Sequence, residues 1–199
     1  MLLSGSKSMD QLRESVLQCN DCALRAGCRQ VVFGEGSPEA RILLIGEGPG
    51  EAEDKLGRPF VGRAGQLLDK ILAACGFGRF EHVFIANIVK CRPPKNRVPL
   101  PEERASCLVH LYAQIRLLEP EIIVLLGATA LQGLIDPLAK ITRARGNWLQ
   151  WNGIWVMPTY HPAALLRNPA LKQPVWEDFK QIVAKYRELV DPGHHAPHS

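Results

Sequence analysis

Three polar side chains, Glu47, Asn87 and His161, each follow a short apolar run in this sequence. An asparagine amide offers a donor beside an acceptor, so Asn87 can read a ring edge that presents N–H beside C=O. His161 can donate a hydrogen bond to an oxygen on which negative charge develops. Glu47 can orient a water molecule or stabilise an opposite positive charge. We interpret this set as chemistry that cleaves a base–sugar bond, where the sugar becomes cationic and the base leaves as an anion.

Glu47 lies in a glycine-rich, acidic segment that runs from Gly46 to Gly65. Its carboxylates would repel a pyrophosphate, and the sequence contains neither GxGxxG nor GxxxxGK[ST], the motifs of dinucleotide-binding and P-loop folds. We therefore expect no nucleotide cofactor. Phe60, the bulky aromatic residue of this segment, could stack on a neutral planar ring. The simpler alternative for such a phenylalanine is a place in the core.

Four of the six cysteines form two groups that could hold one metal centre: Cys19, Cys22, Cys91 and Cys107. Four thiolates in two groups are typical of zinc or of an iron–sulfur cluster. The alternative is a redox C-x-x-C with scattered core cysteines. Cys75 falls on the apolar face of an expected helix and is assigned to the core, whereas Cys28 is a candidate spare ligand.

The elements that must position these groups alternate between strands and helices. Buried strands are expected at 42–45 and 83–86, with a third that ends at Gly127 and a fourth that ends at His161. The longer helices are expected at 9–18, 101–118 and 173–189. This alternation predicts an α/β fold, a three-layer αβα arrangement with a central four-stranded parallel sheet flanked by helices. Ligands of such sheets bind beyond the carboxyl ends of the strands, where the three polar residues would meet.

Length and charge set the remaining expectations. The 199 residues suit a single domain, expected at 1–190, with a disordered tail at 191–199. A net charge of +4 permits an anionic partner without demanding one. No apolar stretch is long enough for a membrane span, and the N-terminal one is too short for a signal peptide. We expect a cytoplasmic protein without membrane contact, and a monomer.

Basic and apolar residues of the loops suggest a polymeric, phosphate-bearing partner. Five basic residues are expected near the same sheet edge: Lys95, Arg97, Arg143, Arg145 and Arg167. Leu165 and Leu166 could wedge into a base stack while a nucleotide is flipped out. Packing of a short helix is the simpler alternative for the two leucines.

Three segments of the chain resemble the signatures of the family 4 uracil-DNA glycosylases, the iron–sulfur type of the uracil-DNA glycosylase superfamily: GEGPGEAEDKLGRPFVGRAGQLLD, NIVKCRPPKNRVP and HPAALLRNP. The resemblance extends over about 12–189. It implies a four-stranded parallel sheet with flanking helices and a [4Fe-4S] cluster. It also implies a monofunctional DNA glycosylase, a hydrolase that excises uracil from single- and double-stranded DNA and leaves an abasic site for base excision repair.

The resemblance further implies roles for individual residues. The cluster ligands match Cys19, Cys22, Cys91 and Cys107. The uracil-contacting residues match Glu47, Gly48, Pro49, Glu53, Phe60, Asn87 and His161. The catalytic set is Glu47, Asp54 and His161, and Glu53 could also guard against the methyl group of thymine. The DNA-contacting set is Lys95, Arg97, Leu165 and Arg167, and the partner is uracil-containing DNA.

The sequence departs from the family pattern at two places. The usual GEAPG reads GEGPG, which predicts a looser loop at Gly48. Superfamily relatives with a GQDPY segment carry a water-activating aspartate at that position, so the partner of the water stays open among Glu47, Glu53 and Asp54. The loop PPKNRVP lacks the histidine of relatives that trap uracil covalently, so trapping is not expected.

Two other functions use the same residues. A non-enzymatic DNA-binding module, such as a polymerase-associated one, would use the fold and the metal only to hold DNA, but pure binding needs no acid, amide and imidazole together. A redox metalloprotein would expose its metal centre to solvent, whereas the cysteines here are expected between helices.

Overall fold

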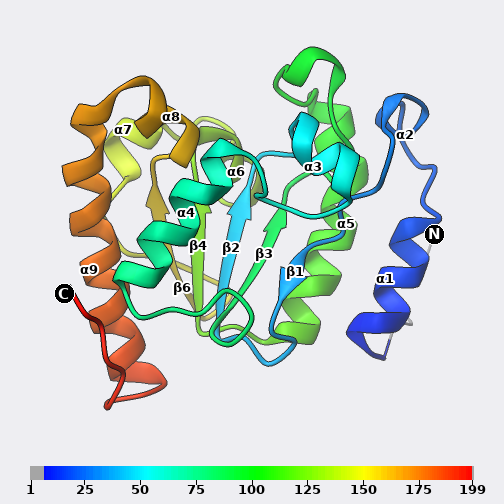
Figure 1. The fold of residues 1–199 in the computed structure, drawn as a ribbon. Coiled ribbons are helices and arrows are strands. Elements are labelled where there is room, and N and C mark those ends of the chain that lie inside the picture. Colours follow the sequence, from blue (N-terminus) through cyan, green and yellow to red (C-terminus); the bar gives the residue numbers. More distant parts are fainter. Residues whose placement is uncertain (1–6, 199) are drawn as a thin grey trace.

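The computed structural model describes residues 7–198. Figure 1 shows one twisted sheet with helices on both of its faces. The strands of the described chain are β1 (Glu35–Gly36), β2 (Ile42–Gly46), β3 (Val83–Asn87), β4 (Ile122–Leu126), β5 (Leu149–Trp151) and β6 (Ile154–Thr159). Their order in the sheet is β1-β3-β2-β4-β6-β5.

The four central strands, β3, β2, β4 and β6, are parallel, as the apolar runs predict. The two edge strands, β1 and β5, are antiparallel to their neighbours and bring the sheet to six strands. β5 and β6 form a hairpin whose turn is Asn152-Gly153, and both turn residues have positive φ. Asn-Gly is the dipeptide that such tight hairpin turns prefer, so the sequence did carry a signal for β5.

The helices connect the strands and cover the sheet. They are α1 (Met9–Leu17), α2 (Leu24–Gly27), α3 (Glu51–Leu56), α4 (Arg63–Ala74), α5 (Pro101–Leu118), α6 (Ala128–Leu134), α7 (Ile141–Ala144), α8 (Pro162–Arg167) and α9 (Lys172–Leu189), with short 3-10 turns at Pro94–Asn96 and Pro169–Leu171. Helix α5 has the expected bounds, because Pro101 suits a first helical position and acidic residues follow it. No helix in the described part of the chain is long and apolar enough to cross a membrane.

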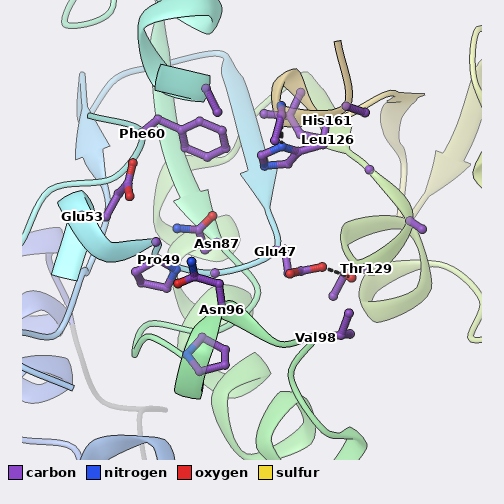
Figure 2. A pocket seen from close by; sticks show the side chains of 18 of the residues that line it. Glu47, Pro49, Glu53, Phe60, Asn87, Asn96, Val98, Leu126, Thr129 and His161 are labelled. Carbon is purple, nitrogen blue, oxygen red and sulfur yellow. Dashed lines mark hydrogen bonds between the residues drawn. The ribbon is translucent and has the colours of Figure 1, made fainter. Parts of the chain in front are cut away.

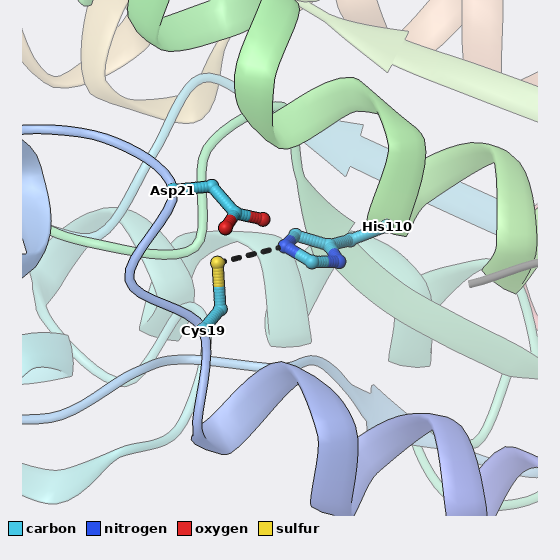
Figure 3. A group of neighbouring side chains, drawn as sticks. All are labelled: Cys19, Asp21 and His110. Atoms are coloured by element: carbon cyan, nitrogen blue, oxygen red, sulfur yellow. Dashed lines mark hydrogen bonds between the residues drawn. The ribbon is translucent and has the colours of Figure 1, made fainter. Parts of the chain in front are cut away.

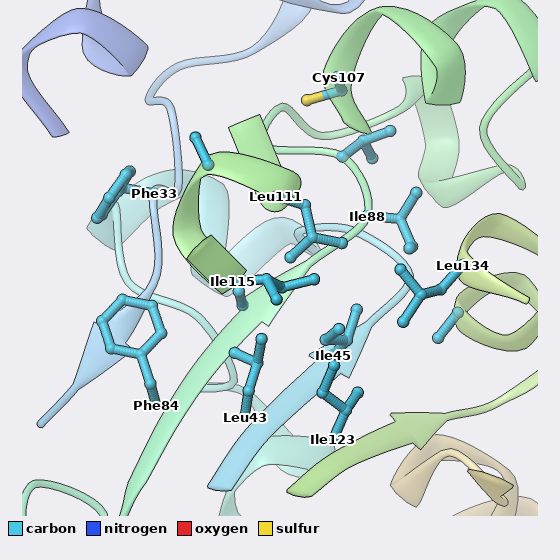
Figure 4. Close-up of a cluster of buried hydrophobic side chains, with 14 of the residues drawn as sticks. Phe33, Leu43, Ile45, Phe84, Ile88, Cys107, Leu111, Ile115, Ile123 and Leu134 are labelled. Atoms are coloured by element: carbon cyan, nitrogen blue, oxygen red, sulfur yellow. The ribbon is translucent and has the colours of Figure 1, made fainter. Parts of the chain in front are cut away.

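The core consists of two apolar layers that sandwich the sheet. Strands β2, β3 and β4 are buried along their whole length, which explains why they are continuous apolar runs. One layer includes Leu111 and Ile115 of α5 against one sheet face (Figure 4). The other layer includes Leu68 of α4 and Phe179 of α9, together with Cys75, as the sequence predicts for that cysteine. Both layers hold the strand ends at fixed positions.

Residues 191–198, for which disorder is expected, lie against the lower end of α4 in the structure. The ring of His194 is buried and stacks on Phe77 with centroids 4.6 Å apart. One of its ring nitrogens, Nε2, lies 2.9 Å from the carbonyl oxygen of Cys75. Ala196 is also buried. Aromatic stacking and apolar contacts give this part of the chain a defined place.

Candidate active site

A cavity of about 550 Å³ opens at the carboxyl ends of the parallel strands. Figure 2 shows side chains that converge on it from β2, β3, β6 and the glycine-rich segment. Those predicted from the sequence are Glu47, Gly48, Pro49, Glu53, Phe60, Asn87, Arg97, His161 and Arg167. The structure therefore brings the acid, the amide and the imidazole of three different strand ends into one site.

Asn87 ends β3 and forms part of the cavity wall. Its side chain is only 2% exposed, and its Oδ1 has no hydrogen-bond partner within residues 7–198. Gly46 lies opposite it in the neighbouring strand, where an added Cβ would come within 2.4 Å of Asn87 Oδ1 and 2.7 Å of Phe60 Cζ. Glycine at position 46 thus leaves the space between the amide and the aromatic ring. A buried acceptor without a partner is costly, so Asn87 is ready for a ligand that offers a donor.

Phe60 is held in place by its backbone. Its φ is +49°, a left-handed value that is uncommon for a bulky residue. The guanidinium of Arg79 donates to the carbonyl oxygens of Phe60 and Pro59, and Gly65 allows α4 to pass close to the same carbonyl. The ring stacks on the imidazole of His161 with centroids 5.4 Å apart and an interplanar angle of 29°. The aromatic wall of the cavity is therefore built before any ligand arrives.

His161 immediately precedes α8 and caps it. Its Nδ1 accepts the backbone N–H of Ala163 at 3.1 Å. In a neutral imidazole the other nitrogen then carries the proton, so Nε2–H is the available donor. Burial, and next the charge of Arg167, lower the pKa of His161 to about 4 against the opposing effect of Glu53. His161 is therefore a neutral donor near pH 7.

The two acids of the cavity have different partners. Glu47 follows β2 and accepts a hydrogen bond from the hydroxyl of Thr129 (Figure 2). Glu53, on α3, accepts the backbone N–H groups of Val61 and Gly62 at 3.0 and 2.9 Å and closes the glycine-rich segment onto the helix. Sequence reasoning missed Thr129, which is the second residue of α6 and lies shortly after the carboxyl end of β4, at the same edge of the sheet as the other site residues.

Asp54, predicted as a catalytic acid, lies outside the cavity, and this is a correction. Its side chain is 3% exposed and accepts the backbone N–H of Arg29 at 2.8 Å. Neighbouring residues of a helix point in directions about 100° apart, so Asp54 faces the 29–30 segment while Glu53 faces the cavity. The position of Asp54 indicates a structural role.

Gly48 also differs from the expectation of a looser loop. An added Cβ would lie 2.7 Å from Cγ2 of Val89, so the segment after β2 runs close to the segment after β3. The backbone N–H of Val89 donates to the carbonyl oxygen of Glu47 at 3.2 Å. The absence of a side chain at Gly48 permits this close approach.

The four predicted metal-ligating cysteines line one small internal cavity near the end of α1, together with Lys90 and His110. Burial, followed by the neighbouring Cys28, raises the pKa of Cys91, and burial raises that of Cys107 to about 11. His110 Nε2 lies 3.2 Å from Cys19 Sγ, with Asp21 beside them (Figure 3). Bound metal favours the thiolate form that burial opposes, so this sulfur-rich donor set suits a metal centre.

The sequence comparisons agree with this arrangement. The family model "Uracil DNA glycosylase superfamily" matches residues 33–180. A type-4 uracil-DNA glycosylase from Thermotoga maritima is 50% identical over 177 residues, which are 87% of this chain and 92% of the relative. This chain belongs to the family of type-4 uracil-DNA glycosylases. Two relatives of the same type are also similar to this chain. The one from Sulfurisphaera tokodaii is 43% identical, over 88% of this chain and 83% of the relative. The one from Saccharolobus solfataricus is 41% identical, over 88% of this chain and 85% of the relative.

The basic residues that were predicted near this sheet edge have different surroundings in the structure. Arg97 and Arg167 line the cavity mouth, but Arg97 is paired with Glu103 through two hydrogen bonds of 2.6 and 2.8 Å. Lys95 is exposed in the adjoining turn. Arg145 is bound to the buried Asp178, so its guanidinium supports the fold.

Leu165 is a second correction. It is 2% exposed and packs in the core layer that includes Phe179, so it does not project from the surface as a wedge would. The neighbouring Leu166 is 40% exposed. Of the two leucines, the structure leaves Leu166 accessible to a base stack.

Proposed function

We propose that this protein hydrolyses the N-glycosidic bond of deoxyuridine in single- and double-stranded DNA and leaves an abasic site, the first step of base excision repair. The observation that carries the proposal is the buried, unpartnered Oδ1 of Asn87 in the cavity wall. Uracil presents N3–H beside a carbonyl oxygen, which match the amide oxygen and the amide NH₂ group of Asn87. Cytosine presents an acceptor at N3, which would face the amide oxygen and be rejected.

The remaining groups account for bond cleavage on a nucleotide that has been flipped out of the helix. Phe60 stacks on the base, and Gly48 and Pro49 line the segment beside it. The Nε2–H of His161 donates to the uracil oxygen that gains negative charge as the bond breaks. Glu47, oriented by Thr129, stabilises the cationic sugar and positions the water that attacks it. Glu53 holds the base-stacking segment in place.

The direct test is an oligonucleotide with a single deoxyuridine, incubated with the protein and then cleaved with alkali. We expect strand cleavage at uracil in single-stranded DNA and opposite guanine or adenine, and release of free uracil. A DNA-binding module or a redox protein would leave the oligonucleotide intact. The same experiment with thymine and cytosine in place of uracil tests the base selectivity.

The four cysteines are proposed to hold a [4Fe-4S] cluster. Cys19 and Cys22 follow α1, Cys91 lies beyond β3 and Cys107 lies on α5, so a bound cluster would cross-link three segments of the chain. All four donors are sulfur, which suits iron–sulfur chemistry. No step of the excision needs to pass through the cluster.

Replacement of Cys107 by serine should therefore abolish the visible thiolate-to-iron absorbance and lower the iron content of the purified protein. Cys75→Ser is the matched control, because Cys75 is buried in the other core layer and should keep the absorbance. Metal analysis that found zinc in place of iron and sulfide would contradict the assignment.

Protonation of His161 should not limit uracil excision between about pH 5.5 and 8, because its pKa is lowered to about 4. Between that value and the ordinary 6.5 the unfolded state binds more protons, so the contribution of His161 to stability rises with pH across this window and is complete above it. NMR titration of the His161 imidazole checks the pKa. An inflection of both the chemical shift and the excision rate near pH 6.5 would refute the neutral-donor role.

The two acids, Glu47 and Asp54, should respond differently to substitution. Glu47→Gln should lower the single-turnover excision rate by roughly 10²-fold or more, as expected for a group that acts on the attacking water. Asp54→Ala should keep the excision rate but destabilise the protein by about 1–3 kcal/mol, because the backbone N–H of Arg29 loses its acceptor. Single-turnover kinetics and thermal unfolding of both variants distinguish the roles. A large rate loss in Asp54→Ala, with little in Glu47→Gln, would reverse the assignment.

A further inference from the structure

Lys90 is a lysine in the interior of the protein. It is 1% exposed and is among the largest fully buried side chains of the described chain. Its Nζ donates to the carbonyl oxygen of Asn87 at 3.0 Å and to Oε1 of Gln114 at 2.6 Å. Lysine side chains are rarely buried this deeply. The two hydrogen bonds fix the position of the Lys90 ammonium inside the protein.

The backbone of Lys90 reaches the cysteine-lined cavity. Lys90 lines this cavity with the four cysteines, and its backbone N–H donates to Cys107 Sγ at 3.2 Å. The next residue along the chain, Cys91, is a second proposed ligand. The backbone of Lys90 therefore links the two segments that supply Cys91 and Cys107.

The same ammonium holds the end of β3. Asn87 O is one of its two acceptors, so Lys90 restrains the backbone of the residue whose side chain faces the active-site cavity. Gln114, the other acceptor, donates in turn to the carbonyl oxygen of Phe33 at 2.9 Å. Gln114 and Cys107 both lie on α5, two helical turns apart on one face. Figure 4 shows Cys107 on this helix, with Leu111 one turn further along.

We propose that Lys90 is a positioning residue that couples the cysteine-lined centre to the base-reading end of β3. Its backbone N–H contacts Cys107 Sγ on one side, and its Nζ fixes the backbone of Asn87 on the other. The inference rests on the proposed uracil excision and on the proposed cluster. Coupling between the binding free energies of two sites is reciprocal, so bound uracil should stabilise the cluster-bound protein, and the cluster should favour uracil binding.

The test compares the wild-type holoprotein with Lys90→Met, which removes the ammonium and keeps an unbranched, flexible side chain. Three quantities are measured: the affinity for free uracil, the affinity for DNA that already contains an abasic site, and the rate at which an iron chelator bleaches the visible absorbance with and without uracil. We expect uracil affinity to fall roughly tenfold, as for the loss of a hydrogen bond from a charged group. Affinity for abasic DNA should stay unchanged, bleaching should accelerate several-fold, and the protection by uracil should disappear.

Lys185→Met is the matched control. This lysine lies on α9, pairs with Glu188 and contacts the ring of Trp155, so the same chemical change there should leave all three quantities unchanged. The proposal would be overturned if Lys90→Met bound uracil as tightly as the wild-type protein and lost its visible absorbance at the same rate. An equal loss of affinity for uracil and abasic DNA would also overturn it, because it would indicate general loosening of the protein.

If Lys90→Met does not fold, Gln114→Leu takes its place, since it removes one acceptor and leaves the ammonium. Changes in the same directions, but smaller, are then expected, and unchanged values would overturn the coupling. Failure of the wild-type protein to excise uracil would instead refute the proposed function. If the wild-type protein excised uracil and Lys90→Met matched it in uracil affinity and in the rate of bleaching, only the coupling would be refuted.

Discussion

Replacement of Asn87 by alanine should reduce uracil excision by roughly 10²- to 10⁴-fold, because two hydrogen bonds to the departing uracil anion, each worth about 1.5–3 kcal/mol, are lost. The fold should survive, because Asn87 Oδ1 accepts no hydrogen bond from residues 7–198. Loss of this oxygen therefore leaves no donor among those residues without its acceptor. Single-turnover cleavage of a uracil-containing oligonucleotide measures the loss, and thermal unfolding verifies the fold. Normal turnover in the folded variant would remove Asn87 from the site.

Two further substitutions separate recognition from simple access. Asn87→Asp should shift the preference toward cytosine, because a carboxylate accepts from an amino group and from a protonated ring nitrogen. Gly46→Ala should instead exclude every base, since the new methyl group would crowd both Asn87 and Phe60. If Asn87→Asp kept its selectivity for uracil, Asn87 would not be the group that reads the base.

Replacement of His161 by alanine should lower the excision rate by roughly 10²- to 10³-fold, the usual cost of losing one donor to a developing oxyanion. The effect should fall on the chemical step and not on binding, because the donor is needed most when the base carries charge. Single-turnover rates at saturating DNA, together with the DNA affinity, separate the two.

His161→Gln is the informative companion, since its amide can still donate a hydrogen bond from a similar position. Partial recovery of the rate in this variant would support a donor role. A rise in KM alone in His161→Ala, with an unchanged rate at saturation, would show that the imidazole serves binding and packing against Phe60.

The two edge strands, β1 and β5, were not predicted from the sequence. Three of the parallel strands, β2, β3 and β4, are apolar nearly throughout because both of their faces are covered by helices. β1 and β5 have only two and three residues, with partly exposed side chains, so they carry no such run. The Asn152-Gly153 turn was the available local signal for the second of them.

The acids and leucines of the site show a different limit. Glu53 and Asp54 are chemically similar neighbours, and Leu165 and Leu166 are identical ones, so composition and motif cannot rank them. The direction of each side chain is decided by what the helix packs against. Asp54 accepts a hydrogen bond from the 29–30 segment, and Leu165 packs in the core layer. Thr129 and Lys90 depend even more on the tertiary structure, because they act through partners far away in the chain.

The sequence by itself determined the layered α/β class, the strand ends that carry Glu47, Asn87 and His161, the cysteine set and the family. These follow from local hydrophobic pattern and residue type, which need no knowledge of distant contacts. Only the tertiary structure decided which acid faces the cavity, which leucine is accessible, and how a buried lysine joins the cysteine-lined centre to Asn87. Those properties arise from contacts between segments that are distant in sequence, and no local pattern encodes the direction in which a side chain will find its partner.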